Sequence, residues 1–150
     1  MTDKKAEIAL LVGGLLAIVG TFMTFATISG GGSSFSLSGK EADEASNYIV
    51  AGGFAILTGL VVWFSSGATV RKVMSILAII IVGFFGVYGA INDISSIKDV
   101  AAGQAGGFEV STGMGLYICL IGSIVAVVGA VMAMRQGGAV VTEPVAPPPA

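Results

Sequence analysis

Four stretches of the chain are long, apolar and free of charged side chains, and they alternate with short polar segments. These stretches are Ile8–Ile28, Tyr48–Phe64, Val73–Ile91 and Gly113–Met134. A helix needs roughly 17–25 residues to cross the hydrocarbon core of a bilayer. None of the stretches alternates between apolar and polar residues as a membrane β-strand does. The pattern therefore predicts an all-α membrane protein, a four-transmembrane-helix bundle with its transmembrane domain over residues 1–135.

The polar segments refine these boundaries. Ser38 followed by Glu41 fits a capping box, which predicts that the second helix begins early, with charged first turns over residues 40–45. The first five residues resemble the start of a signal peptide, but the 21-residue apolar stretch after them favours an uncleaved helix. The segment 136–150 is rich in glycine and proline and is predicted to be a disordered cytoplasmic tail.

Two short alternations of apolar and polar residues fall between the predicted helices. Phe35–Ser38 and Phe108–Ser111 each alternate as a half-buried strand does, so we expect a small two-strand extracytoplasmic cap. The segment Gly30–Gly32 before the first alternation is flexible by composition. Isoleucine or valine recurs every third residue from Ile91 to Val100. That recurrence indicates a continuation of the third helix or an interfacial segment.

The basic residues predict the orientation of the bundle in the membrane. Five of the seven lie in segments that four spans place on one side: Lys4, Lys5, Arg71, Lys72 and Arg135. The other side holds Lys40 and Lys98 among several carboxylates. Because basic residues concentrate in cytoplasmic loops, we expect a cell-membrane, multi-pass protein with both termini in the cytoplasm.

Composition excludes several function classes. Hydrophobic residues make up 55% of the chain and charged residues 11%, too few charges for a soluble surface. The chain has no histidine, one cysteine and a net charge of −2. These counts argue against histidine acid–base catalysis, Cys/His zinc sites, an internal disulfide and nucleic-acid binding.

Small residues recur at seven-residue spacing within the predicted helices. Seven residues make nearly two helical turns, so the members of each pair share a face and allow close approach of neighbouring helices. We therefore predict helix-packing roles for four pairs, with a backbone-lined ligand or ion path as the alternative: Gly13 and Gly20, Gly52 and Gly59, Gly83 and Ala90, Gly122 and Gly129.

The search for chemistry yields no catalytic, cofactor-binding or metal-binding residues. The outer-loop carboxylates are interpreted as solvated charges, with a shared cation site as the alternative: Glu41, Asp43, Glu44, Asp93, Asp99 and Glu109. Cys119 is interpreted as a small packing residue. The predicted spans contain no charge, whereas ion-coupled transporters keep ionisable groups in the membrane.

Several short motifs resemble small four-helix membrane proteins common in actinobacteria. They are Ile28-Ser29, Leu37-Ser38-Gly39-Lys40-Glu41-x-Asp43, the segment Tyr88–Ile94 and the segment Ser111–Tyr117. The resemblance covers roughly residues 7–134 and implies a topology and a bacterial cell membrane, but no activity.

These observations favour a non-enzymatic structural or accessory subunit without cofactors. Its expected partners are the lipid bilayer and other copies of itself or other membrane subunits, with no nucleic acid and no identified small-molecule substrate. The alternative is a small oligomeric pore or holin-like protein. That alternative needs a polar stripe along one helix, which Thr21, Thr24 and Thr27 supply in part.

Overall fold

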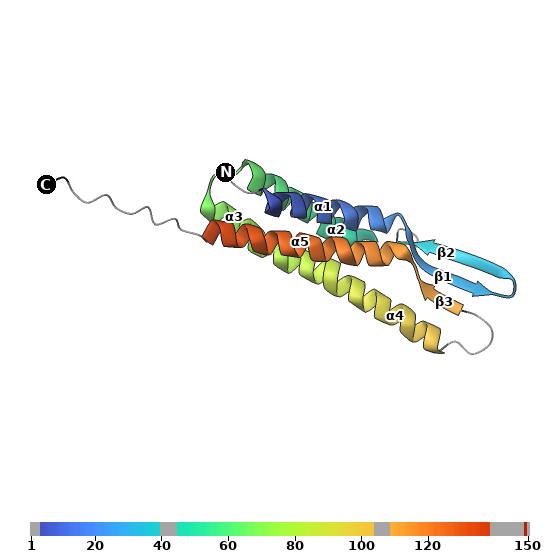
Figure 1. Ribbon diagram of the computed structural model, residues 1–150. Coiled ribbons are helices and arrows are strands. Elements are labelled where there is room, and N and C mark those ends of the chain that lie inside the picture. Colours follow the sequence, from blue (N-terminus) through green and yellow to red (C-terminus); the bar gives the residue numbers. More distant parts are fainter. Residues whose placement is uncertain (1–3, 40–44, 104–108, 139–148, 150) are drawn as a thin grey trace.

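The computed structural model describes residues 4–39, 45–103, 109–138 and 149. It is mostly helical, with a small sheet at one end of the helices (Figure 1). The elements are α1 (Lys5–Thr21), β1 (Thr24–Gly30), β2 (Ser33–Ser38), α2 (Ala45–Phe64), α3 (Ala68–Ile81), the π-helix η1 (Val82–Tyr88), α4 (Gly89–Gly103), β3 (Glu109–Thr112) and α5 (Met114–Gly138). The order of the four long helical segments follows the sequence prediction.

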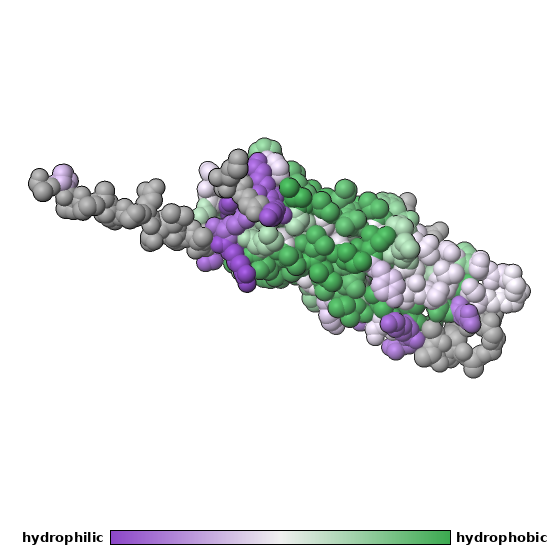
Figure 2. Space-filling view, viewed as in Figure 1, coloured by the Kyte–Doolittle hydropathy of each residue, from purple (hydrophilic) through white to green (hydrophobic). Residues whose placement is uncertain are grey.

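Three of the described helical segments are long and apolar enough to cross a membrane: Ala45–Phe64, Ala68–Val100 and Met114–Gln136. The helix α1 is shorter, at 17 residues. Apolar residues cover the middle of the molecule, and hydrophilic residues gather toward its two ends (Figure 2). This arrangement fits the predicted membrane class.

The first predicted span is wrong over its last third. The helix α1 ends at Thr21, whose hydroxyl donates to the carbonyl of Ile18 at 2.6 Å, and the chain then continues as β1. The segment Thr24–Gly30 is rich in β-branched and aromatic residues, which favour extended backbone. Because this segment is also apolar, hydropathy did not distinguish the strand from the end of the helix.

The sheet has three antiparallel strands in the order β2-β1-β3, so the predicted two-strand cap is incomplete. The two predicted strands do not pair with each other, because both pair with β1, on opposite edges. Gly31 and Gly32 form the two-residue turn between β1 and β2, with φ of 61° and 84°. Two consecutive positive φ values are typical of a type I′ hairpin turn. The glycines expected to be flexible therefore close a tight hairpin.

The third helical segment is much longer than its apolar stretch. The segments α3, η1 and α4 follow one another without a break, and the helical segment Ala68–Val100 has 33 residues. At 1.5 Å per residue it is about 50 Å long, whereas the hydrocarbon core is about 30 Å thick. The isoleucine and valine repeat is therefore a continuation of the helix, and α4 extends beside the sheet (Figure 1).

Two predictions concern residues outside the described ranges. The expected charged first turns of the second helix fall on residues 40–44, which are not described, and the described helix begins at Ala45. Ser38, the proposed capping residue, is the last residue of β2, and its expected partner Glu41 lies outside the described residues. Most of the expected tail also lies outside the described residues, and α5 continues to Gly138.

Candidate functional site

The backbones of α1 and α5 lie in close contact in the described bundle. A β-carbon built on Gly13 would lie 2.5 Å from both the backbone nitrogen of Ala126 and the carbonyl oxygen of Gly122. A β-carbon on Gly122 would lie 2.6 Å from the backbone nitrogen of Ala17. A β-carbon at either position would overlap the backbone of the other helix, so glycine is required at both positions.

Other predicted packing residues lie at similar contacts. Gly20 faces Cys119 and the carbonyl of Gly115, and Gly129 faces the start of α1. A β-carbon built on Gly52 would lie 2.6 Å from the carbonyl oxygen of Gly14, which places α1 close to α2, and one built on Gly59 would meet side chains of α1. Ala90 is fully buried in a cluster that includes Phe25, Tyr48, Leu116 and Cys119.

Gly83 differs from the other predicted packing residues. A β-carbon there would meet nothing within 4 Å. Gly86 takes its place, because a β-carbon on Gly86 would overlap the side chain of Ser123. Both glycines lie in η1, where the wider i→i+5 turns of a π-helix change which residues face a neighbour.

The interior of the bundle contains isolated hydroxyl groups. Thr58, Ser75 and Ser123 are fully buried on three different helices, and their hydroxyl oxygens accept or donate no hydrogen bond within the described residues. The expected threonine stripe is absent as a helical feature, because Thr24 and Thr27 belong to β1. Only Thr21 remains on α1, and its hydroxyl is bonded to its own helix.

A buried ion pair at the N-terminal end of the bundle was not predicted. The Arg71 Nη2 atom lies 2.7 Å from Glu7 Oε1, and the two side chains are 17% and 3% exposed. Arg71 also donates from Nε and Nη2 to the carbonyl of Val62, at 3.3 and 3.0 Å. Val62 is in the last turn of α2, where helix carbonyls lack partners within the helix. One arginine thus ties the start of α1, the end of α2 and the start of α3 together.

The signal for this pair was present in the sequence but indistinct. Glu7 directly precedes the first apolar stretch, and Arg71 lies in the short connection after the second. Both resemble the charged residues that ordinarily lie next to the ends of a membrane span. Only the packing of α1 against α2 brings the two flanks together.

The opposite end of the bundle holds a second polar contact. The hydroxyl of Tyr48 on α2 donates to Asp93 Oδ2 on α4. Tyr48 is fully buried, and its ring meets Phe25 edge-on with centroids 5.5 Å apart. Phe25 lies where the pairing of β1 with β2 shifts register. Such irregularities change the direction in which a side chain points. The sheet, α2 and α4 therefore meet at this contact.

A pocket of about 330 Å³ opens beside Asp93, between α4 and the sheet. The described residues that line it are Phe25, Ala26, Leu37, Asn92, Asp93, Ser96 and Ile97. Asp93, one of the predicted carboxylates, thus lies in the wall of this pocket. Asp99 and Glu109 are exposed, and Glu41, Asp43 and Glu44 lie outside the described residues. Among the described residues, no three His, Cys, Asp or Glu side chains gather where they could hold a metal ion, so the alternative of a shared cation site has no such cluster there.

Cys119 occupies a packing position between α5 and α1. It is fully buried, and its Sγ atom donates to the carbonyl of Ala17 at 3.2 Å. The same sulfur would lie 2.6 Å from a β-carbon on Gly20. The thiol is enclosed by the contact between the two helices.

Comparisons with known proteins add no functional assignment. No protein-family model matches the chain, and the search of curated proteins gives no match either.

Proposed function

We propose that the chain is a multi-pass cell-membrane protein with four spans, α1, α2, the α3–η1 segment and α5. Three of these segments belong to helices long and apolar enough to cross a bilayer. The 17 residues of α1 extend about 25 Å, close to the hydrocarbon thickness. Large apolar side chains stay exposed on the outside of the helices, including Leu15, Leu57, Ile80 and Ile121. Water is a poor solvent for such a belt, whereas lipid is a good one.

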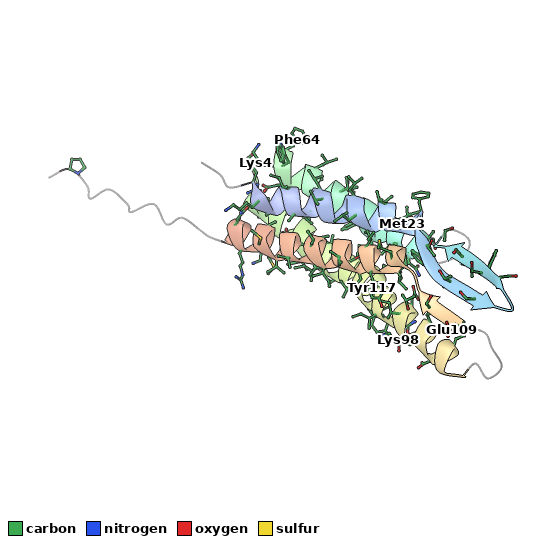
Figure 3. The ribbon with its side chains drawn as sticks, turned by 45° about the vertical axis from the view of Figure 1, so that its right-hand side comes forward. Lys4, Met23, Phe64, Lys98, Glu109 and Tyr117 are labelled. Atoms are coloured by element: carbon green, nitrogen blue, oxygen red, sulfur yellow. The ribbon has the colours of Figure 1, made fainter. Side chains whose placement is uncertain are left out.

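In this proposal both termini lie in the cytoplasm. Lys4 and Phe64 lie together at one end, and Lys98 and Glu109 lie near the sheet at the other (Figure 3). The end with Lys4 also holds Arg71, Lys72 and Arg135, because the ends of α2 and α5 and the start of α3 meet there (Figure 1). Lys4 Nζ sits 3.9 Å from the centroid of Trp63, an aromatic residue suited to the membrane interface. The excess of basic residues supports a cytoplasmic assignment of this end.

Within the membrane, the protein acts as a non-enzymatic structural or accessory subunit, through helix packing with itself or with a larger membrane complex. The observation that carries this proposal is the backbone contact between α1 and α5, at Gly13 and Gly122. Because the backbones of α1 and α5 are in contact there, no room is left for an ion or ligand path between these two helices. Meanwhile η1 presents an exposed aromatic cluster outward, with Phe84 stacked on Tyr88 and edge-on to Phe85.

The test is ion flux across vesicles that contain the purified full-length protein. We expect vesicles at moderate protein loading to stay tight to potassium ions and to a small anionic dye. Empty vesicles and vesicles with a known pore give the two reference levels. Reproducible flux that is lost in the triple variant Thr58→Val, Ser75→Ala, Ser123→Ala would contradict the proposal and favour a pore.

A further inference from the structure

Among the described residues, the carboxylate of Asp93 has no cationic partner. Its only partner among the described residues is the Tyr48 hydroxyl, which is neutral. Lys98 is on the same helix but five positions later, whereas side chains on one helix meet at three or four positions. Lys98 instead lines a separate hollow with Ile94 and Leu120. A partly buried carboxylate without a cation is unfavourable, so a positively charged group would be bound here.

The pocket surrounding this charge has the form of a site for a small molecule. Its volume of about 330 Å³ is at the lower end of the range for ligand pockets. The polar groups come from α4, where Asn92 and Ser96 lie on either side of Asp93 in sequence. The apolar wall comes mainly from the sheet, through Phe25, Ala26 and Leu37. Oxygen acceptors thus face an apolar wall across one cavity.

We infer that this pocket binds a primary ammonium group carried on a short apolar body. An ammonium group has three donors, which match the carboxylate of Asp93, the amide oxygen of Asn92 and the hydroxyl of Ser96. A hard metal ion is less well matched, because Asp93 is the only carboxylate in the described lining. The apolar body would lie against Leu37 and Ile97.

Two sources can supply this chemistry in a membrane: a free amine in the outer compartment and the ethanolamine headgroup of a phospholipid. Asp93 follows Tyr88 by about one helical turn, beyond the apolar stretch Val73–Ile91. The site is therefore at the height of the headgroups if the proposed membrane position holds. Binding of a free amine does not depend on that position, so the two arms of the experiment are independent.

The first arm titrates the full-length protein with n-butylammonium in dodecyl maltoside, which contains no amine. The readouts are the NMR signals of the Asn92 side-chain amide and of the backbone amides of Ser96 and Ile97. We expect saturable shifts at these signals, and affinity for n-butanol weaker by about tenfold or more, since n-butanol lacks the charge. Asp93→Asn keeps the Tyr48 hydrogen bond but removes the charge, and it should weaken n-butylammonium binding by about tenfold or more.

Two further variants separate the pocket from general charge effects. Asp99→Asn removes the same charge from an exposed position on the same helix and should leave the affinity unchanged. Ser96→Leu keeps the charge of Asp93 but fills the pocket, and it should abolish the shifts. Equal losses in Asp93→Asn and Asp99→Asn, or full binding in Ser96→Leu, would overturn the assignment.

The second arm compares nanodiscs of phosphatidylglycerol alone with nanodiscs containing phosphatidylethanolamine. Shifts at the same signals with phosphatidylethanolamine, absent in Asp93→Asn, identify the lipid headgroup as a ligand. Shifts only with n-butylammonium identify a free amine. The absence of Asp93-dependent shifts in both arms would refute the ammonium site, whatever the outcome of the vesicle flux experiment.

Discussion

The two ends of this bundle each place a carboxylate among packed helices, and they satisfy it differently. Glu7 is almost fully buried and is paired with Arg71, which also caps the last turn of α2. Asp93 receives a hydrogen bond from the buried hydroxyl of Tyr48 and faces a pocket. The first arrangement pairs Glu7 Oε1 with a cation of the same chain and holds three helices together, while Glu7 Oε2 has no hydrogen-bond partner among the described residues. The second leaves a charge for a group from outside.

The packing is tighter around Glu7 than around Asp93. Near Glu7 and toward the middle of the bundle, glycines bring the backbones of α1, α2 and α5 into contact. Near Asp93, α4 extends beyond the helix seam and lies beside the sheet (Figure 1). We therefore interpret the N-terminal end as the closed, structural part of the bundle and the sheet end as the part that is open to ligands.

The largest expected effect comes from breaking the closed end. Arg71→Met leaves the Glu7 carboxylate buried without a cation, which should lower the free energy of unfolding by about 3–5 kcal/mol. Unfolding is followed by titration with sodium dodecyl sulfate in mixed micelles. Lys72→Met removes the adjacent exposed charge and should have little effect. The double variant Glu7→Leu, Arg71→Met should recover most of the stability. A double variant no more stable than Arg71→Met would contradict this account of the pair.

The corresponding change at the open end is Tyr48→Phe. It removes the only hydrogen bond that the described residues donate to Asp93 and should destabilise the protein by about 1.5–3 kcal/mol. The loss is smaller than at Arg71 because Asp93 stays accessible from the pocket. The matched control is Tyr88→Phe, whose ring is exposed and stacked on Phe84. Equal stability of the Tyr48→Phe and Tyr88→Phe proteins would show that the Tyr48–Asp93 contact contributes nothing.

A methyl group added between α1 and α5 tests the close backbone contact of these helices directly. Gly122→Ala places a β-carbon 2.6 Å from the backbone nitrogen of Ala17, so α1 and α5 must separate. We expect a loss of about 1–3 kcal/mol in the same unfolding assay. Gly53→Ala makes the same change where a β-carbon meets nothing within 4 Å, and should be neutral or slightly stabilising. Equal changes in the free energy of unfolding for Gly122→Ala and Gly53→Ala would show that the contact between α1 and α5 does not depend on glycine at position 122.

The smallest expected effect concerns the hydroxyl groups inside the bundle. Thr58→Val replaces a buried hydroxyl that has no partner among the described residues with a methyl group of similar size. The free energy of unfolding should change by less than about 0.5 kcal/mol or increase. A large loss of stability would mean that Thr58 binds water or another group, and that the interior is more open than the packing indicates.

Hydropathy predicted the helical segments well because length and apolar composition are properties of the sequence itself. The strand β1 was missed because Phe25, Ala26 and Ile28 raise hydropathy in a strand as much as in a helix. The ion pair of Glu7 and Arg71 joins positions 64 residues apart, so no local pattern reports it.

The sequence spacing also selected the wrong glycine on the packing face of the third helical segment. Gly83 was selected by a seven-residue spacing that assumes α-helical turns, but residues 82–88 form a π-helix. The wider turns bring Gly86 to Ser123 instead. Asp93 was interpreted as a solvated charge of an outer loop, with a shared cation site as the alternative. Its pocket was not predicted, because Phe25 and Ala26 of the unpredicted strand β1 form part of the wall.

We propose that this protein acts through association within the membrane. The most direct measurement extracts the membrane with a styrene–maleic acid copolymer and determines the mass and composition of the discs that contain the chain. We expect discs in which the 15.0 kDa chain occurs in a defined number of copies or with a constant second membrane protein. Discs that hold single copies of the chain without any recurring protein partner would contradict it.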